Sequence, residues 1–260
     1  MKTLFHRFNL RGPVRGDARP SRAFAVLALF TLALSACSSP GPEGEFYDPL
    51  EPQNRAIHAF NKSVDKAVIR PSANVYGEVV PAPAKYVVTS FTDNLAMPNR
   101  FINNVLQFNI ESAAITTLRF TLNTVVGLGG LLDVATVLGL PDEDTDFGET
   151  LSVWQVGEGA YVELPLFGPN TARGAVGKVA DTLLLDPLGF IIPNREKTIR
   201  TGVWALDKLG DRHQYADLID EMLYNSADSY VTERSYYLQN RRFQLSKELS
   251  EADLEDPYAQ

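Results

Sequence analysis

Residues 125–140 read VVGLGGLLDVATVLGL, an apolar stretch of 16 residues that carries one charge, Asp133, and four glycines. Gly127, Gly129 and Gly130 stand in its middle, where each glycine costs a helix about 1 kcal/mol relative to alanine. A broken segment of this length is too short to span a bilayer as a helix, which takes about 20 residues. Two interpretations stay open: a buried hairpin in a soluble core, or a bent or re-entrant apolar element that meets lipid.

The residues before this segment have the spacing of amphipathic helices. Apolar side chains recur every three or four positions at Ile57, Phe60, Val64 and Val68, at Val87, Phe91 and Leu95, at Phe101, Val105 and Phe108, and at Ile115, Leu118, Leu122 and Val125. The last group predicts a helix over about 111–126. Prolines mark the expected boundaries, since Arg70-Pro71 should end the first helix and Pro98 should open the third.

The first helix has a start signal of its own. In the stretch Asp48-Pro49-Leu50-Glu51, Asp48 is expected to cap the helix, Pro49 to occupy its first position and Glu51 to complete a capping box. The folded domain is therefore expected to begin at residue 48.

The residues after the glycine-rich segment are also mainly helical in pattern. The spacing predicts helices near 147–155, 171–184, 196–209 and 213–249, and one short strand in YVELPLF, residues 161–167. The sequence therefore predicts a mainly α-helical domain over residues 48–249, followed by an acidic C-terminal tail over residues 250–260.

The first 36 residues have the layout of a lipoprotein signal peptide. Six basic residues precede the apolar run AFAVLALFTLALSA, which ends directly before Cys37, and 14 residues suit a secretory signal better than a membrane span. Leu34-Ser35-Ala36-Cys37 matches the lipobox, in which the cysteine thiol receives diacylglycerol. Cys37, the single cysteine of the chain, is the expected lipid anchor. Residues 37–47 would form a flexible tether, and Ser38 favours sorting to the outer membrane.

Composition and motifs argue against several classes of function. Without the signal peptide the chain has 18 basic and 31 acidic residues, a net charge of −13, so it lacks the basic surface that nucleic acids require. No nucleophile elbow, phosphate-binding loop or zinc-protease motif occurs. His58 and His213 are expected at the surface, and the acidic run over residues 142–146 is expected to be a solvated turn rather than a calcium loop. We therefore expect no catalytic residue, metal or cofactor.

Several longer motifs occur in the order of one known family. They are the opening residues Asp48, Pro49, Leu50, Glu51, Asn54, Arg55, Phe60 and Asn61, then RFTLNTVVGLGGLLDVA (119–135), DFGETLSVWQVGEGAYVELPLFGPNTARGAVGKVAD (146–181), DPLGFI (186–191) and DSYVTERSYYLQNRR (228–242). From about residue 48 to residue 243 the chain resembles the VacJ/MlaA outer-membrane lipoproteins. Pro52-Gln53 departs from the family pattern, in which a small residue and a phenylalanine are common.

The resemblance implies a ring-like helical protein, embedded in the periplasmic leaflet of the outer membrane, with an amphipathic central channel. The channel candidates are Gly127, Gly129, Gly130, Leu131, Leu132 and Asp133. The implied partners are phospholipids, a trimeric outer-membrane porin and the periplasmic lipid carrier of the Mla pathway. That pathway removes phospholipids mislocalised to the outer leaflet and so maintains lipid asymmetry. A porin-associated structural lipoprotein without its own channel, and a phospholipase, are the alternatives.

Overall fold

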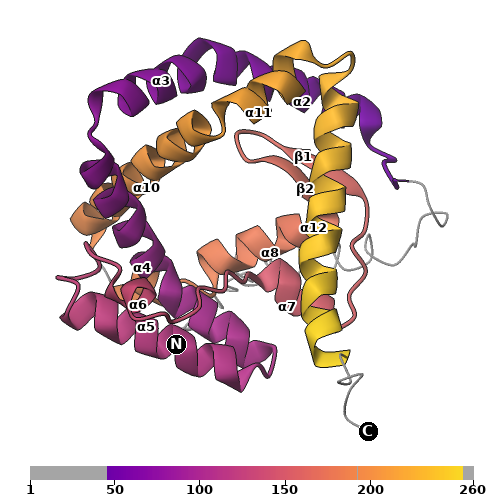
Figure 1. Cartoon of the computed structure of the whole chain (residues 1–260). Helices are drawn as coiled ribbons and strands as arrows, with labels where there is room; N and C mark the ends of the chain where they lie inside the picture. The colour runs from indigo at the N-terminus through magenta and orange to yellow at the C-terminus, as the bar shows by residue number, and fades with distance from the viewer. Residues whose placement is uncertain (1–45, 192, 254–260) are drawn as a thin grey trace, which may run out of the picture.

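The computed structural model describes residues 46–191 and 193–253, and its helices follow one another around a ring (Figure 1). The prediction of a mainly α-helical fold is confirmed, and the strand expected within residues 161–167 is the first strand of a hairpin. The signal peptide and Cys37 lie outside the described residues. Phe46 and Tyr47, which the sequence assigned to the tether, are ordered: Phe46 packs on the cluster of Tyr161, Tyr230 and Leu238.

The elements are α2 (Glu51–Val64), the π-helical turn η1 (Asp65–Ile69), α3 (Arg70–Val79), α4 (Ala82–Leu106), α5 (Ile110–Val125), α6 (Val134–Val137), α7 (Phe147–Val153), β1 (Tyr161–Leu164), β2 (Gly168–Thr171), α8 (Ala172–Leu183), α9 (Pro187–Ile191), α10 (Asn194–Gln214), α11 (Ala216–Asp220), the π-helical turn η2 (Glu221–Asn225) and α12 (Ser229–Asp253). The two strands pair antiparallel, with Tyr161 opposite Thr171 and Leu164 opposite Gly168.

The ring closes where the first and last helices meet. In Figure 1 the wall runs from α2 through α3, α4 and α5 to α7 and α8, and α12 completes it beside α2. The Arg55 guanidinium on α2 donates to both carboxylate oxygens of Asp228, just before α12, at 3.2 and 3.0 Å. α10 packs on α3 and α4. The hairpin of β1 and β2 contacts α10 through the rings of Phe167 and Trp204, whose centroids are 6.5 Å apart.

The polarity of the wall is inverted relative to a soluble helical protein. The residues that the sequence aligned as apolar helix faces include several whose side chains point outward: Phe60, Val68, Phe101, Val105, Phe108, Leu118 and Val125, which are 41–83% exposed. Met97 and Ala113 apart, the buried positions of α2, α4 and α5 are polar; they include Asn54, Asn94, Arg100, Asn103, Asn104, Thr116, Arg119 and Asn123. A soluble domain normally hydrates such polar groups and buries the apolar ones.

Two prolines do not act as the sequence analysis expected. Pro71 does not end the first helix: the chain passes through η1, where the Arg70 N–H bonds to the Asp65 carbonyl, and continues as α3. A π-helical turn changes the local phase of the helix, and Pro71 then stands in the first turn of α3, where it is tolerated. Pro98 does not open a helix either, because it lies inside α4. The packing of α4 on α5 and α10 supports the helix through this residue.

The expected cap of the first helix is also wrong. α2 begins at Glu51, with Leu50 at the cap position and Pro52, rather than Pro49, in its first turn. The Asp48 carboxylate instead accepts hydrogen bonds from Asn54 Nδ2 at 2.9 Å and from the Tyr230 hydroxyl, and it pairs with Arg234. Asp48 is therefore a link between the start of the ring and α12.

The last predicted helix, 213–249, is broken into parts. α10 extends to Gln214, and α11 and η2 follow before α12 starts at Ser229. The prediction of one long helix missed the break at residues 226–228, where the backbone of Ser226 is extended with φ −73° and ψ 151°. This break places Asp228 and Ser229 beside α2.

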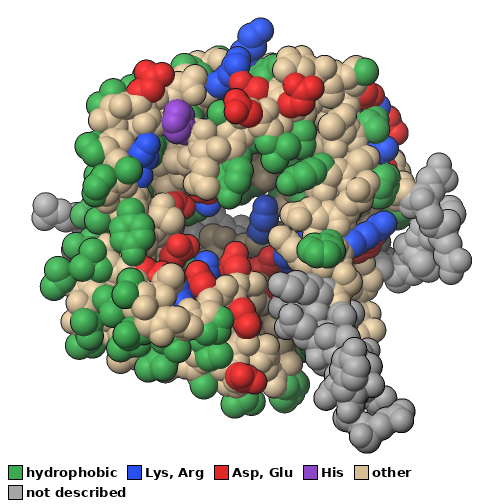
Figure 2. Space-filling view, viewed as in Figure 1, with side chains coloured by type: hydrophobic (Ala, Val, Ile, Leu, Met, Phe, Trp, Pro, Cys, Tyr) green, Lys and Arg blue, Asp and Glu red, His purple; other side chains and the backbone are tan. Residues whose placement is uncertain are grey.

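The centre of the ring is hollowed (Figure 2). Acidic and basic side chains gather on the rim of the opening, and hydrophobic side chains are prominent along the outer edge over α4 and α5. Across the described residues, no helix combines the length with the hydropathy needed to traverse a bilayer.

Candidate functional site

The glycine-rich segment turns sharply after α5. Leu128, Gly129 and Gly130 have φ of 58°, 76° and 91°, the left-handed region that favours glycine. Gly127 is needed for close approach: a Cβ there would lie 2.2 Å from the Leu132 carbonyl oxygen. A Cβ at Gly130 would lie 2.5 Å from Asn94 Nδ2, whereas one at Gly129 would have nothing within 4 Å. The glycines therefore make the tight bend that the sequence predicted.

The outer surface of this bend is apolar and exposed. Val125, Val126, Leu128, Leu131, Leu132, Val137 and Leu138 are 39–81% exposed. The interpretation as a hairpin buried in a soluble core is therefore wrong, because the backbone bends as expected but the side chains do not enter a core. A group of exposed apolar side chains of this kind is typical of a site that contacts lipid or another protein.

The inner side of the bend is an ion-pair network. Arg119 on α5, whose side chain is 3% exposed, pairs with Asp133 at 3.1 Å, and Asn123 Nδ2 donates to the same carboxylate at 3.0 Å. Burial alone would raise the pKa of Asp133, but hydrogen bonds from Thr136 and Asn123 and the charge of Arg119 lower it below its usual range. Asp133 is thus a stable anion that also caps α6 by accepting from the Thr136 N–H. The segment 127–133 therefore has an apolar outer side and a charged inner side.

The acidic run joins this network. Residues 142–144 are exposed, as predicted, yet Asp142 contacts both Arg100 and Arg119, at 3.1 and 3.4 Å. Asp93 lies 3.4 Å from Arg100. Burial and the neighbouring carboxylates, which include Asp142, outweigh Arg100 and raise the pKa of Asp93 to about 6. The interior of this wall therefore carries both signs of charge in close contact.

The family-motif residues at the start of the chain hold the hairpin. Asn54, which is buried, donates to the Tyr161 carbonyl at 3.0 Å and accepts from the Glu163 N–H at 2.9 Å. Asn61 does the same two turns later, with the Leu164 carbonyl at 3.0 Å and the Leu166 N–H at 2.8 Å. The two amides stand in for a neighbouring strand along β1 and the turn that follows it. Pro49, Leu50 and Phe60 are exposed.

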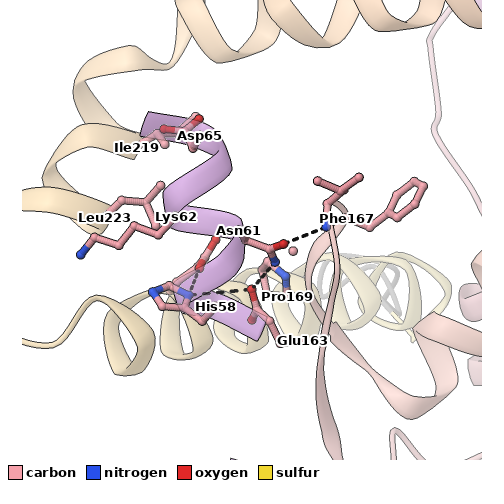
Figure 3. A pocket seen from close by; sticks show the side chains of 12 residues that line it. His58, Asn61, Lys62, Asp65, Glu163, Phe167, Pro169, Ile219 and Leu223 are labelled. Carbon is pink, nitrogen blue, oxygen red and sulfur yellow. Dashed lines mark hydrogen bonds and ion pairs between the residues drawn. The ribbon is translucent and has the colours of Figure 1, made fainter. Parts of the chain in front are cut away.

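A second cluster lies where α2, β1 and α12 meet, and sequence reasoning missed it. His58 Nδ1 is 2.9 Å from Glu233 Oε2 and 3.8 Å from Glu163 Oε1, and His58 Nε2 is 2.9 Å from Ser229 Oγ. Figure 3 shows His58 and Asn61 on one helix, turned toward Glu163. His58 is 5% exposed, so its predicted surface position is wrong. His213, by contrast, is half-buried in the last turn of α10.

The charges of this cluster are set by its two carboxylates. Burial lowers the pKa of His58, but the close contacts and negative charges of Glu163 and Glu233 outweigh burial and raise the pKa to about 9. Tyr161 donates to Glu163 Oε2 at 2.5 Å, and burial with this neighbour raises the pKa of Tyr161 far above its usual range. The spacing of residues in the sequence could not predict the cluster, since its members come from three separate elements.

The comparisons with known proteins agree with the ring. The family model of the MlaA lipoprotein matches residues 46–244. The "Intermembrane phospholipid transport system lipoprotein MlaA" of Escherichia coli (strain K12) is 35% identical over 226 residues, 84% of this chain and 87% of the relative. The protein of the same name from Haemophilus influenzae is 32% identical, over 87% of this chain and 91% of the relative.

A solved structure has the same fold. It is described as the "Structural basis for maintenance of bacterial outer membrane lipid asymmetry", with a TM-score of 0.64, 34% identity, and coverage of 76% of this chain and 98% of that one. Family model, relatives and fold coincide over the ring described above, and the chain belongs to the MlaA lipoprotein family.

Proposed function

We propose that this protein is the outer-membrane lipoprotein of a phospholipid-transport system. It takes phospholipids mislocalised to the outer leaflet and passes them to a periplasmic carrier, which maintains the lipid asymmetry of the outer membrane. Membership of the MlaA lipoprotein family and relatives named for intermembrane phospholipid transport support this proposal.

The inverted polarity of the ring is the observation that carries the proposal. Exposed apolar side chains along α4, α5 and the bend suit contact with acyl chains, and the charged side chains on the rim of the opening suit contact with headgroups. A phospholipid headgroup resists entry into hydrocarbon because burying an unpaired charged group costs several kcal/mol. A hollow ring with charged groups on its rim offers that headgroup polar partners while the tails remain in lipid. No nucleophile or cofactor is needed for this task.

The bend over residues 127–133 is proposed to border the channel. Its exposed leucines, Leu128, Leu131 and Leu132, would face acyl chains. Asp133, paired with Arg119, would form the polar side of the segment. The chemistry of the segment supports this placement because both polarities meet within a few residues.

The anchor and the partners follow from the same proposal. Cys37 would carry the acyl chains, and two or more chains are needed for firm attachment to a membrane. The protein would lie on the periplasmic side of the outer membrane and associate there with a trimeric porin. The partner proteins are proposed on the family resemblance alone.

A phospholipase is the alternative that one observation raises. Ser229, His58 and Glu233 are in contact in the order of a Ser-His-Glu triad. Glu163 and Glu233 together, however, raise the pKa of His58 to about 9, so at neutral pH it holds its proton and cannot take one from Ser229. The backbone N–H groups next to Ser229, those of Tyr230 and Val231, already donate to the Asp228 carboxylate and so do not form an oxyanion hole. We therefore propose a protein without enzymatic activity.

Deletion of the gene tests the proposal. The deletion strain should accumulate outer-leaflet phospholipid and become sensitive to detergent, and the wild-type gene should restore both. Complementation with Ser229→Ala should also restore both, without a change in lysophospholipid. Lysophospholipid that depends on Ser229 would favour the phospholipase. Normal asymmetry in the deletion strain would favour a structural lipoprotein that only clamps a porin.

A further inference from the structure

The cluster of His58, Glu163 and Glu233 has the composition of a metal site. One nitrogen and two carboxylate oxygens, one from each side chain, all lie within 4.8 Å of one another. Zinc takes this combination of ligands, with Zn–N of about 2.0–2.1 Å and Zn–O of about 2.0–2.2 Å. Tetrahedral coordination at those lengths separates the ligand atoms by about 3.3–3.5 Å. The observed separations from His58 Nδ1, 2.9 and 3.8 Å, bracket that range.

The orientation of His58 points to a ligand rather than to a completed hydrogen bond. Its Nδ1 atom is buried and has no hydrogen-bond partner of regular geometry, although Glu233 Oε2 is only 2.9 Å away. The side chain is 6% exposed, and that of Glu163 is 1% exposed. Nδ1 is thus held between two carboxylates by charge, without a regular hydrogen bond, and such a buried nitrogen is uncommon in folded proteins. An ion between the three side chains would complete the coordination of Nδ1.

The outer partners of the cluster have the form expected around a metal ion. His58 Nε2 lies 2.9 Å from Ser229 Oγ, so an N–H there fixes the ring with Nδ1 facing the carboxylates. Glu163 Oε2 accepts from the Tyr161 hydroxyl at 2.5 Å, and Glu163 Oε1 accepts from Asn61 Nδ2 at 3.1 Å. Metal-bound imidazoles and carboxylates are commonly oriented by such neighbours.

The charge and the space around the cluster also suit a divalent cation. Without the ion the two carboxylates keep His58 protonated, so Zn²⁺ would displace the Nδ1 proton into solvent on binding. The two carboxylates and the neutral imidazole would then carry −2, which Zn²⁺ neutralises. The nearby Lys62 ammonium is turned to Ser229 Oγ, at 3.2 Å, and to the Tyr224 ring. The three side chains line a cavity of about 260 Å³, which has room for a water molecule as fourth ligand.

We propose that His58 Nδ1, Glu163 Oε1 and Glu233 Oε2 bind one Zn²⁺ ion, with water from the adjoining cavity as the fourth ligand. The ion would tie α2, β1 and α12 together at the closure of the ring. The site goes beyond phospholipid transport and does not depend on it.

Zinc binding to the purified full-length lipoprotein tests the site. The protein is prepared in detergent without a histidine tag, treated with a chelator and dialysed against Zn²⁺. We expect one Zn²⁺ per chain and a rise in melting temperature with Zn²⁺. Glu163→Gln and Glu233→Gln should each lose saturable binding, and Tyr161→Phe should weaken binding about 10–100-fold. The matched controls His213→Gln and Glu158→Gln should bind as the wild type does.

Two outcomes would overturn the site. One is the absence of saturable Zn²⁺ binding to the folded wild-type protein, which would leave a simple buried ion pair. The other is retention of binding in folded Glu163→Gln and Glu233→Gln. Because these variants risk misfolding, Glu233→His provides an independent measurement. It removes a carboxylate that an ion pair requires but supplies a second imidazole, so a zinc site should be retained in it, and a loss of Zn²⁺ binding in the folded variant would count against the proposal.

Discussion

Arg119 on α5 and Asp133 at the start of α6 form an ion pair, 3.1 Å long, that closes the bend between the two helices. Between them in the chain, Val125, Val126, Leu128, Leu131 and Leu132 are exposed, while the pair itself is mostly shielded from solvent. The bend is therefore held from its polar side.

Arg119→Ala should destabilise the ring strongly. Removal of one partner of a buried pair leaves the other uncompensated and typically costs about 3–5 kcal/mol. We expect the lower end, because the Asp133 side chain is 22% exposed. Thermal unfolding in detergent measures the loss. Arg242→Ala is the control, since its pair with Glu158 is solvent-exposed and should change stability by less than about 1 kcal/mol. Equal melting of the two variants would contradict this role of Arg119.

Gly127→Ala should destabilise the bend by about 1–3 kcal/mol, the usual cost of overpacking. The new Cβ would lie 2.2 Å from the Leu132 carbonyl and 2.5 Å from the Asn123 carbonyl, both backbone atoms that cannot move aside easily. Gly202→Ala in α10 is the matched control, because its Cβ would meet nothing within 4 Å and alanine favours a helix. Melting temperatures should fall for Gly127→Ala and stay level or rise for Gly202→Ala. A wild-type melting temperature for Gly127→Ala would show that the bend relaxes freely.

Asn54→Ala should loosen the hairpin from α2. The substitution leaves the Glu163 N–H and the Tyr161 carbonyl without their partner, and each buried unpaired group costs about 1–3 kcal/mol. Hydrogen exchange at the Glu163 amide should accelerate. Asn225→Ala, which removes only an exposed contact with Glu221, should leave that exchange rate unchanged. Unaltered exchange in Asn54→Ala would mean that β2 alone holds β1.

Stability should depend on the protonation of Asp93. Its pKa in the folded protein, about 6, is above the ordinary value of 3.8, so the folded state binds the proton more tightly. This contribution is fully present below pH 3.8 and is lost as the pH rises through about 6. Asp93→Asn, which cannot ionise, should lose less stability than the wild type between pH 5 and pH 7.5. Parallel pH profiles of melting temperature for the two proteins would contradict the shift.

Cys37→Ala tests the lipid anchor. Without the thiol, diacylglycerol cannot be attached, and the precursor should keep its signal peptide. Radiolabelled fatty acid incorporation and the apparent mass on a gel measure both effects. Ser38→Ala should be acylated and cleaved normally. A processed, outer-membrane form of Cys37→Ala would show that the lipobox was misassigned.

Helix content was predictable because the period of the apolar residues is a local property. Leu118 and Val125 correctly marked one face of α5, but the same pattern does not say whether that face meets protein or something else. Only the structure shows that the apolar face of α5 points outward, because Arg119 and Asn123 are buried on the opposite side of the helix. The positions of helix ends failed for a different reason. The π-helical turn before Pro71 begins at the buried Asp65, which pairs with Arg212 on α10 at 2.9 Å, a contact that the residues beside Pro71 do not reveal.

The His58 cluster could not be predicted from the sequence. A histidine in a polar stretch is usually solvated, and nothing near residue 58 names Glu163 or Glu233 as neighbours. By contrast, the bend at Gly127–Gly130 was predictable, because glycines in an apolar run restrict the backbone options whatever surrounds them. Contacts between polar residues that are far apart in the chain produce no periodic pattern in the sequence, so they cannot be predicted from it.

The junction of Arg55 with Asp228 sets the order in which the ring can fold. These partners are 173 positions apart, and closing a loop of that length costs about 5 kcal/mol of chain entropy. The walls can assemble from neighbouring helices as the chain emerges, but the circle is completed only after nearly all of it is available. A chain truncated before α12 would be an open arc with its polar inner surface unsealed, and added protease should cleave it faster than the closed ring.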